Sequence, residues 1–241
     1  MVDPENQKSL PGQPPAASSA VPLTLGLPAR QLNTLTGNLL CASAATQPGV
    51  LPVFSASELL NGDDDRGRIA VRLDCDPADL RGNRSGRYEA VRFDLDCDIE
   101  DLPEALDVRV PAPLAIFVRG CSPAESAEQI VAAGRIPGLD VDGPMSDSAG
   151  PVSDFLSVLA HSDVGFVARV RSEPDVLALL CGTVAALRGA DTRRALSEPD
   201  PQMLTALSAE AADAVREVLT GIEVPDSTPV LAMFAQIGIG P

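Results

Sequence analysis

Lysine and histidine are almost missing from this sequence. The only lysine is Lys8 and the only histidine is His161, so arginine supplies nearly all of the positive charge. Because Lys8 lies in a Pro- and Ser-rich N-terminal stretch, we expect no Schiff-base lysine and no phosphate loop that depends on a lysine. A single histidine likewise excludes metal sites built from two or three imidazoles.

Several sequence signatures are missing as well. Neither a GxSxG nucleophile turn nor a GxGxxG dinucleotide fingerprint occurs. No apolar run approaches the roughly 20 residues that span a bilayer, and the residues after Met1 do not resemble a secretion signal. The five cysteines are widely spaced and contain no CxxC pair. We therefore expect a cytoplasmic protein with reduced thiols.

Positive charge is scarce overall, because the formal net charge is −16. Such a field repels nucleic acid and anionic membrane surfaces, so neither is an expected partner. A protein partner or a second copy of the chain is the expected alternative. Aromatic residues make up only 3% of the chain, with no Trp, while hydrophobic residues make up 45%. The core is therefore predicted to consist of aliphatic side chains in packed helices and strands.

Composition divides the chain into two parts. Residues 1–28 are rich in Pro, Ser, Ala and Gln, which predicts a disordered tail. Residues 29–241 carry alternating strand and helix patterns, which predicts one globular domain of the α/β or α+β class. We favour an open mixed sheet with covering helices over an incomplete barrel.

Two segments show the clearest strand patterns. Apolar and polar residues alternate over about 68–76 and again over about 90–99. Such alternation predicts strands with one buried face and one solvated face, typical of antiparallel pairing. The segment 81–87 between them, RGNRSGR, is predicted to be the turn of this antiparallel pair.

A strand, a tight turn and a helix are predicted around residue 120. Leu114–Val118 is a continuous apolar run, and the sequence Ser122-Pro123-Ala124-Glu125 begins a helix with a capping-box pattern. Further helices are predicted at 151–160, 173–187 and 201–220, and further strands at 139–141, 164–170 and 230–234.

The first candidate site is Arg119, Cys121 and Ser122, which lie between this strand and this helix. Ligands of α/β sheets gather at the carboxyl ends of strands, and a helix N-terminus attracts anions and activates thiols. These three are weak catalytic candidates, with Arg119 as an anion-binding residue. In the alternative interpretation, Ser122 only caps the helix and Cys121 only fills space.

The second and third candidates are charged clusters. Asp74, Asp94, Asp96 and Asp98 share strand faces and form a candidate Mg²⁺ or Ca²⁺ site, or else a solvated acidic face. Arg81, Arg84 and Arg87 lie in the predicted turn and form a candidate anion site, or else a solubilising loop tip. No other cofactor is predicted.

Two functions follow from this inventory. The favoured one is a binding, regulatory or assembly protein without catalytic activity. The alternative is a lyase or hydrolase that uses carboxylates and arginine, with or without a divalent cation, on a small anionic substrate. In that enzyme, Arg119 holds the anion and Asp94 or Asp96 binds the metal or acts as base.

Overall fold

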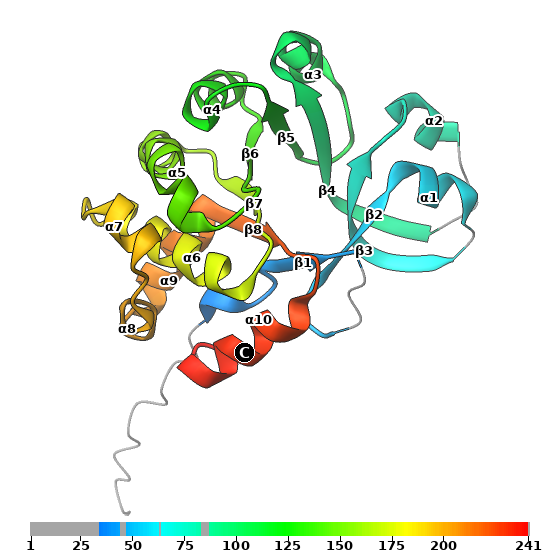
Figure 1. The fold of residues 1–241 in the computed structure, drawn as a ribbon. Coiled ribbons are helices and arrows are strands. Elements are labelled where there is room, and N and C mark those ends of the chain that lie inside the picture. Colours follow the sequence, from blue (N-terminus) through cyan, green and yellow to red (C-terminus); the bar gives the residue numbers. More distant parts are fainter. Residues whose placement is uncertain (1–33, 44–46, 63, 83–86, 241) are drawn as a thin grey trace, which may run out of the picture. The chain divides into compact units, whose positions relative to one another are not determined.

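Eight strands, all parallel to their neighbours, form the centre of the protein in the computed structural model, which describes residues 34–43, 47–62, 64–82 and 87–240. Each strand pairs with the next one in the sequence, and β1 also pairs with β8, so the sheet closes into a barrel (Figure 1). The strands are β1 (Leu40–Ala42), β2 (Leu51–Ser55), β3 (Asp65–Leu73), β4 (Arg87–Asp98), β5 (Leu114–Arg119), β6 (Ile136–Asp140), β7 (Phe166–Arg169) and β8 (Leu219–Glu223). The predicted tail, residues 1–28, lies outside the described residues.

Helices surround the barrel. They are α1 (Ala56–Asn61), α2 (Pro77–Gly82), α3 (Leu102–Asp107), α4 (Pro123–Ala132), α5 (Met145–Leu159), α6 (Glu173–Leu187), α7 (Thr192–Ser197), α8 (Pro201–Thr205), α9 (Ala209–Val218) and α10 (Ser227–Ile237), with short 3-10 turns η1 (Thr34–Thr36) and η2 (Ile99–Asp101). None of these helices has the length and hydropathy that a membrane crossing requires. The architecture is a β/α-barrel, with α1, α2 and α3 only six residues long each.

The prediction of a mixed sheet with an antiparallel strand pair is wrong. Strands β3 and β4 are parallel, with Asp65 beside Arg87 and Leu73 beside Leu95. The reason is that 77–82 forms helix α2, which leads the chain back along the outside of the barrel before β4 begins. Residues 81 and 82 therefore end a helix and Arg87 begins the next strand, in agreement with the crossover that parallel strands require, while residues 83–86 lie outside the described residues.

The interpretation of the alternating pattern also needs correction. On β4, the apolar residues Phe93 and Cys97 pack into a cluster with α3 and α4, as predicted. The polar face points into the barrel, where Arg92 and Asp94 are buried, and its acids become accessible only toward the end of the strand, at Asp96 and Asp98. Closing a sheet into a barrel turns one face of every strand inward, so alternation on β4 separates an apolar outer face from a charged inner face.

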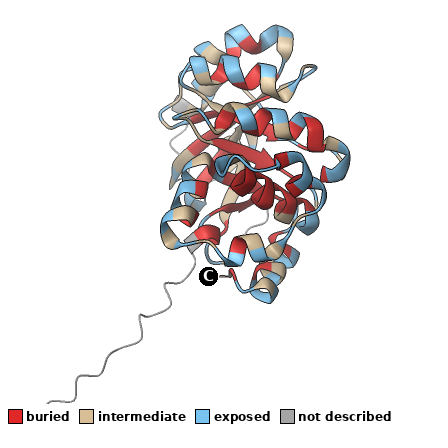
Figure 2. Cartoon of the chain, turned by 90° about the vertical axis from the view of Figure 1, so that its left-hand side faces the viewer, coloured by how far each residue is buried: buried red, intermediate tan, exposed pale blue. Residues whose placement is uncertain are grey.

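Two apolar layers hold the helices on the barrel. One joins β3, β4 and β5 to α1, α3 and α4 through residues such as Ile69 and Ile116. The other joins β6, β7 and β8 to the longer helices, where Phe155 of α5 meets Phe166 of β7 edge to face, with ring centroids 5.2 Å apart. Figure 2 shows these buried residues on the barrel and on the sides of the helices that face it.

Local sequence signals near the ends of helices and strands were mostly sufficient to place these elements. The strand Leu114–Arg119 and the helix Pro123–Ala132 occur as predicted, although Ser122 makes no side-chain capping bond. Residues 173–187 are helix α6, as predicted. The predicted strand at 230–234 is instead part of α10, because Asp226 caps its start and Gly238, with φ of 78°, ends it. The predicted helix at 201–220 divides into α8, α9 and the start of β8.

Candidate functional site at the carboxyl end of the barrel

Charged side chains alternate in sign around the carboxyl end of the barrel. From β3 to β8, successive strands contribute an arginine and a carboxylate in turn near their last residues: Arg72, Asp96, Arg119, Asp140, Arg169 and Glu223. The members on β6, β7 and β8 lie at matched heights, since Asp140 is beside Arg169 and Arg169 is beside Glu223 in the strand register. We call these six residues the charged ring. In β/α-barrels, substrates bind at this end of the strands.

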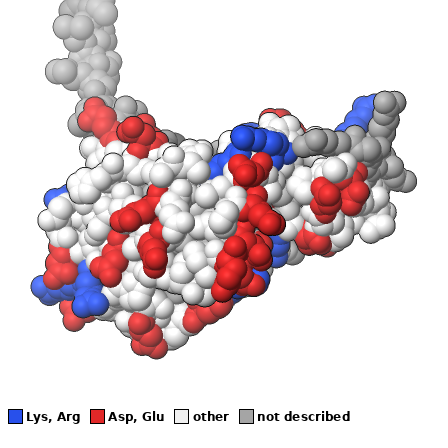
Figure 3. Space-filling model, turned by 90° about the horizontal axis from the view of Figure 1, so that it is seen from above, with Lys and Arg blue, Asp and Glu red and all other residues white. Residues whose placement is uncertain are grey.

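The ring encloses a pocket of about 400 Å³. All six members of the charged ring line it, together with Arg171 from the segment after β7. The charged residues that line the pocket are thus four arginines and three carboxylates, which leaves a net charge of +1 at pH 7. The rest of the protein is strongly acidic, and acidic side chains are spread over the face shown in Figure 3. The pocket is therefore a local site where an anion is tolerated.

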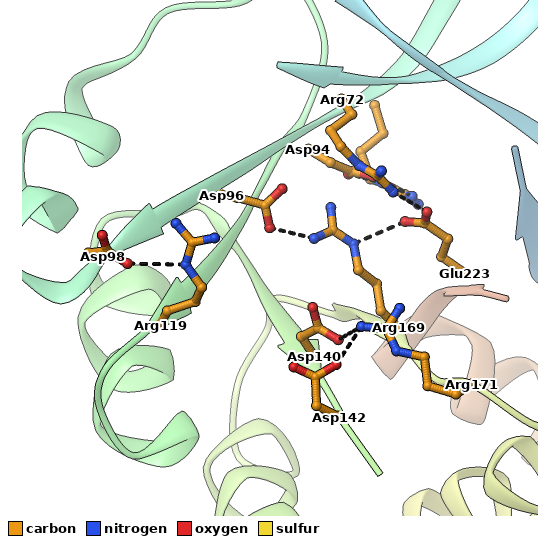
Figure 4. Close-up of polar contacts among 11 residues, drawn as sticks. Arg72, Asp94, Asp96, Asp98, Arg119, Asp140, Asp142, Arg169, Arg171 and Glu223 are labelled. Atoms are coloured by element: carbon orange, nitrogen blue, oxygen red, sulfur yellow. Dashed lines mark hydrogen bonds and ion pairs between the residues drawn. The ribbon is translucent and has the colours of Figure 1, made fainter. Parts of the chain in front are cut away.

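Arg169 is the most buried arginine of the charged ring. Its side chain is 7% exposed, and its Nε donates to Glu223 Oε2 at 3.0 Å while its Nη1 donates to Asp96 Oδ1 (Figure 4). Burial alone would lower the pKa of Arg169, but the hydrogen bond and the charge of Asp96 outweigh it and raise the pKa above its usual value. Arg169 is therefore a permanent positive charge inside the barrel.

Glu223 joins Arg169 to Arg72 across the barrel. Arg72 Nη2 donates to Glu223 Oε1, so one carboxylate accepts from two guanidinium groups. Two buried donor atoms remain without a hydrogen-bond partner among the described residues: Arg72 Nε and Arg169 Nη2. A buried N–H group without a partner loses free energy unless a ligand or water accepts from it. Both atoms belong to residues that line the pocket, so they favour an oxygen-bearing ligand there.

Asp140 is a carboxylate of the charged ring with a raised pKa. Burial raises the pKa of Asp140 above its ordinary value, although Arg171 and Arg169 act in the opposite direction. Arg171 Nη2 donates to Asp140 at 3.1 Å and to Asp142 at 2.6 Å. A carboxylate with a raised pKa that lines a pocket is suited to accept and return a proton.

Deeper in the barrel, Arg92 and Asp94 form a closed pair. Arg92 donates from Nε to Asp94 Oδ1 at 2.6 Å and from Nη2 to Asp94 Oδ2 at 3.1 Å, and both side chains are buried. Glycine at position 221 makes room for this arginine, since a Cβ there would lie 2.8 Å from Arg92 Nη1. A pocket of about 470 Å³ opens near Arg92 at the opposite end of the barrel, but the charge of Arg92 is already neutralised by Asp94.

Of the first predicted site, the structure brings one residue to the pocket. Arg119 is the last residue of β5, lines the pocket and donates from Nε to Asp98 Oδ1 at 3.1 Å. Cys121 and Ser122 follow in the connection to α4, and neither lines this pocket.

The four predicted metal ligands have separate partners. Asp94 binds Arg92, Asp96 binds Arg169, and Asp98 binds Arg119. Asp74 lies elsewhere, where it accepts hydrogen bonds from the backbone N–H and the hydroxyl group of Ser57 at the start of α1. Within the described residues, no group of three or more His, Cys, Asp or Glu side chains has the arrangement of a metal site. The Mg²⁺ or Ca²⁺ hypothesis stays a prediction.

The structure describes the predicted arginine cluster only in part. Arg81 belongs to helix α2, Arg84 lies outside the described residues, and Arg87 is exposed at the first position of β4. The first residues of parallel strands are at the opposite end of the barrel from the charged ring. An anion-binding role for these three arginines stays a prediction.

Sequence reasoning missed most of the charged ring. Arg72, Asp140, Arg169 and Glu223 were not singled out, and neither was Arg171. A signal was present: Arg169 interrupts the apolar run Phe166–Val170, and Asp140 and Glu223 each end an apolar strand. A single charge at the end of a buried strand marks the functional end of a parallel sheet.

Comparisons of this chain with protein-family models, with curated proteins and with solved structures gave no match. The function therefore has to be inferred from the chemistry of the pocket itself.

Proposed function

We propose that this protein is an enzyme that binds a small anionic substrate at the carboxyl end of the barrel and acts on it by proton transfer. The observation that carries the proposal is the pair of buried donors, Arg72 Nε and Arg169 Nη2, that have no partner among the described residues and belong to pocket-lining side chains. In the bound state the two side chains turn these buried donors toward the pocket, where a carboxylate or phosphate oxygen of the substrate accepts from them, which satisfies both donors and places negative charge beside two guanidinium groups.

Asp140 supplies the proton transfer in this proposal. Burial raises the pKa of Asp140, and its neighbour Arg171 divides its hydrogen bonds between Asp140 and Asp142. The Asp140 carboxylate takes a proton from a carbon atom of the bound anion, the electron pair of the broken C–H bond passes into the neighbouring carbonyl or carboxylate group, and the proton returns to substrate or solvent in the second half of the reaction. Isomerisation uses this step, and in elimination the electron pair instead expels a leaving group.

This proposal takes up the alternative that the sequence left open, without the divalent cation. The sequence favoured a binding or assembly protein because few catalytic residue types are present. A pocket with a net positive lining and a carboxylate of raised pKa supports the enzyme instead. A binding protein would share the anion site but would have no use for proton transfer by Asp140.

Anion binding is tested first, by thermal unfolding of the full chain at low ionic strength with acetate or inorganic phosphate. Binding to the folded state raises the melting temperature. We expect Arg72→Gln to weaken binding by about 1.5–3 kcal/mol, the usual contribution of a hydrogen bond to a charged group. Arg87→Gln is the matched control, because Arg87 is exposed at the other end of the barrel. If neither anion raises the melting temperature, the proposal fails.

Proton transfer is tested separately, without knowledge of the natural substrate. Incubation with pyruvate or succinate in D₂O, followed by NMR, detects exchange of the carbon-bound protons next to the ketone of pyruvate or next to a carboxylate of succinate. We expect the protein to accelerate this exchange and Asp140→Asn to abolish the acceleration while anion binding persists. Anion binding without accelerated exchange of either compound would leave a binding protein and remove the catalytic part of the proposal.

A further inference from the structure

The pocket carries four arginines at two depths. Arg169 and Arg72 contribute the buried, unpartnered donors, whereas Arg119 and Arg171 are 68% and 50% exposed at the rim. We infer that the substrate is a small dicarboxylate, with one carboxylate at Arg72 and Arg169 and the other at the rim beside Arg119. This inference rests on the proposed function and specifies its substrate class.

Arg119, at the rim of the pocket, has hydrogen-bond donors that no described residue uses. Arg119 uses only Nε, which donates to Asp98, so its two terminal nitrogens have no hydrogen-bond partner among the described residues. Figure 4 shows Arg119 and Arg169 on either side of Asp96, a carboxylate that is already held by Arg169. A ligand that satisfies only Arg72 and Arg169 would leave the Arg119 donors to solvent. A second acidic group on the same ligand reaches them from inside the pocket.

The surroundings of the pocket favour carboxylates over phosphates. Phosphate groups in barrels are commonly held by helix N-termini after β7 and β8, where backbone N–H groups point at the ligand. In this protein, acids occupy those positions. Asp226 accepts from Thr228 N at the start of α10, and Glu173 and Asp175 lie in the first turn of α6. Binding therefore depends on guanidinium side chains, whose planar fork matches a carboxylate.

The carboxylate of Asp175 occupies the starts of two helices. Its side chain accepts from the backbone N–H of Met145 at 2.8 Å and from the Ser172 hydroxyl at 2.6 Å, so it also occupies the start of α5. A phosphate dianion would place two negative charges on one group near these carboxylates, whereas a dicarboxylate divides its two charges between the arginines at the two depths of the pocket. The pocket volume of about 400 Å³ is near the lower end of ligand pockets, which limits the ligand to a small molecule.

The test is isothermal titration calorimetry on the full chain at low ionic strength, with acetate, malonate, succinate, glutarate and inorganic phosphate as probes. We expect at least one dicarboxylate to bind tenfold or more tightly than both acetate and phosphate. Arg119→Gln is expected to reduce the affinity for that dicarboxylate to within about twofold of acetate, and to leave acetate binding unchanged. Arg87→Gln, the control, is expected to change neither affinity.

Three results would overturn the inference: dicarboxylates that bind no more tightly than acetate, phosphate that binds most tightly, or Arg119→Gln without effect on the dicarboxylate. Each of these leaves the proposed anion site intact, because Arg72→Gln would still weaken whichever probe binds. Absence of binding by every probe overturns the proposed function itself. Because Arg119 is exposed, its substitution is not expected to impair folding, and the melting temperature of the variant checks this.

Discussion

The guanidinium group of Arg169 lies over the aromatic ring of Phe117, with Cζ 3.6 Å from the ring centroid. Phe117 comes from β5 and Arg169 from β7, so the contact crosses the interior above the short strand β6. Position 138 on β6 has to be glycine for this contact, since a Cβ there would lie 2.4 Å from the ring. The aromatic ring of Phe117 therefore packs directly against the guanidinium group of the most buried arginine of the pocket.

Gly138→Ala tests this packing of Phe117 against Arg169. The added methyl group forces the Phe117 ring to move, and we expect a loss of about 1–3 kcal/mol of stability, typical of an overpacked core. Because Arg169 rests on the ring, acetate binding is expected to weaken as well. Denaturant unfolding and calorimetry measure the two effects.

Gly240→Ala is the control for that substitution, because a Cβ at position 240 meets only ordinary contacts of 3.4 Å or more. If Gly138→Ala lowers stability but leaves acetate affinity at the wild-type value, the ring supports the barrel without positioning Arg169.

The buried pair Arg92 and Asp94 gives a second prediction. Asp94→Ala leaves the buried guanidinium group without its bidentate partner, so we expect a loss of roughly 3–5 kcal/mol. The double variant Arg92→Met, Asp94→Leu removes both charges together and is expected to be more stable than Asp94→Ala. Urea unfolding of the wild type, Arg92→Met, Asp94→Leu and the double variant measures the coupling between the two residues. A double variant less stable than Asp94→Ala would show that the pair contributes more than mutual neutralisation.

Local sequence signals were enough to place Arg119, although not to reveal its neighbours. Pro123 at the first turn of α4 and Gly120, whose φ is 83°, fix the end of β5 within a residue or two. The tendency of ligands to gather at strand ends then puts Arg119 beside a pocket. Nothing in that segment shows which strands lie next to it, so Arg169 and Glu223, which lie far away in sequence, could not be associated with Arg119.

The sequence did not predict the barrel because charged residues on some of its strands point inward. Arg72 and Asp94 alternate with apolar residues, and a polar residue in an alternating strand ordinarily faces solvent. In addition, α2 has only six residues and is followed by a Gly- and Asn-containing segment, so it has the composition of a turn. Parallel pairing depends on that short helix, and tertiary closure decides that the polar face is buried.

Divalent cations test the predicted metal site at Asp94, Asp96 and Asp98. Each of these carboxylates already accepts from an arginine, so a cation would have to displace a guanidinium group. We therefore expect Mg²⁺ and Ca²⁺ at millimolar concentration to leave the melting temperature unchanged. A rise that disappears in Asp96→Asn would instead establish the metal site and would require a metal-dependent version of the proposed reaction.

The contact between Asp74 and Ser57 predicts a pH dependence of stability. Asp74 accepts from the Ser57 hydroxyl and backbone N–H, and the hydroxyl contact is the main reason that the pKa of Asp74 is lowered from its ordinary value. A carboxyl group whose pKa is lower in the folded state stabilises the protein above its unfolded pKa, near 4, and loses this contribution as the pH falls through the folded pKa. We expect Asp74→Asn to cost roughly 1 kcal/mol at pH 7, as for one lost hydrogen bond, and clearly less at about pH 3, below the unfolded pKa. Asp79→Asn is the control, because Asp79 is an exposed acid in α2 and has no side-chain hydrogen bond among the described residues. Equal losses for Asp74→Asn at pH 7 and at pH 3, measured by urea unfolding, would contradict the role of its charge at the start of α1.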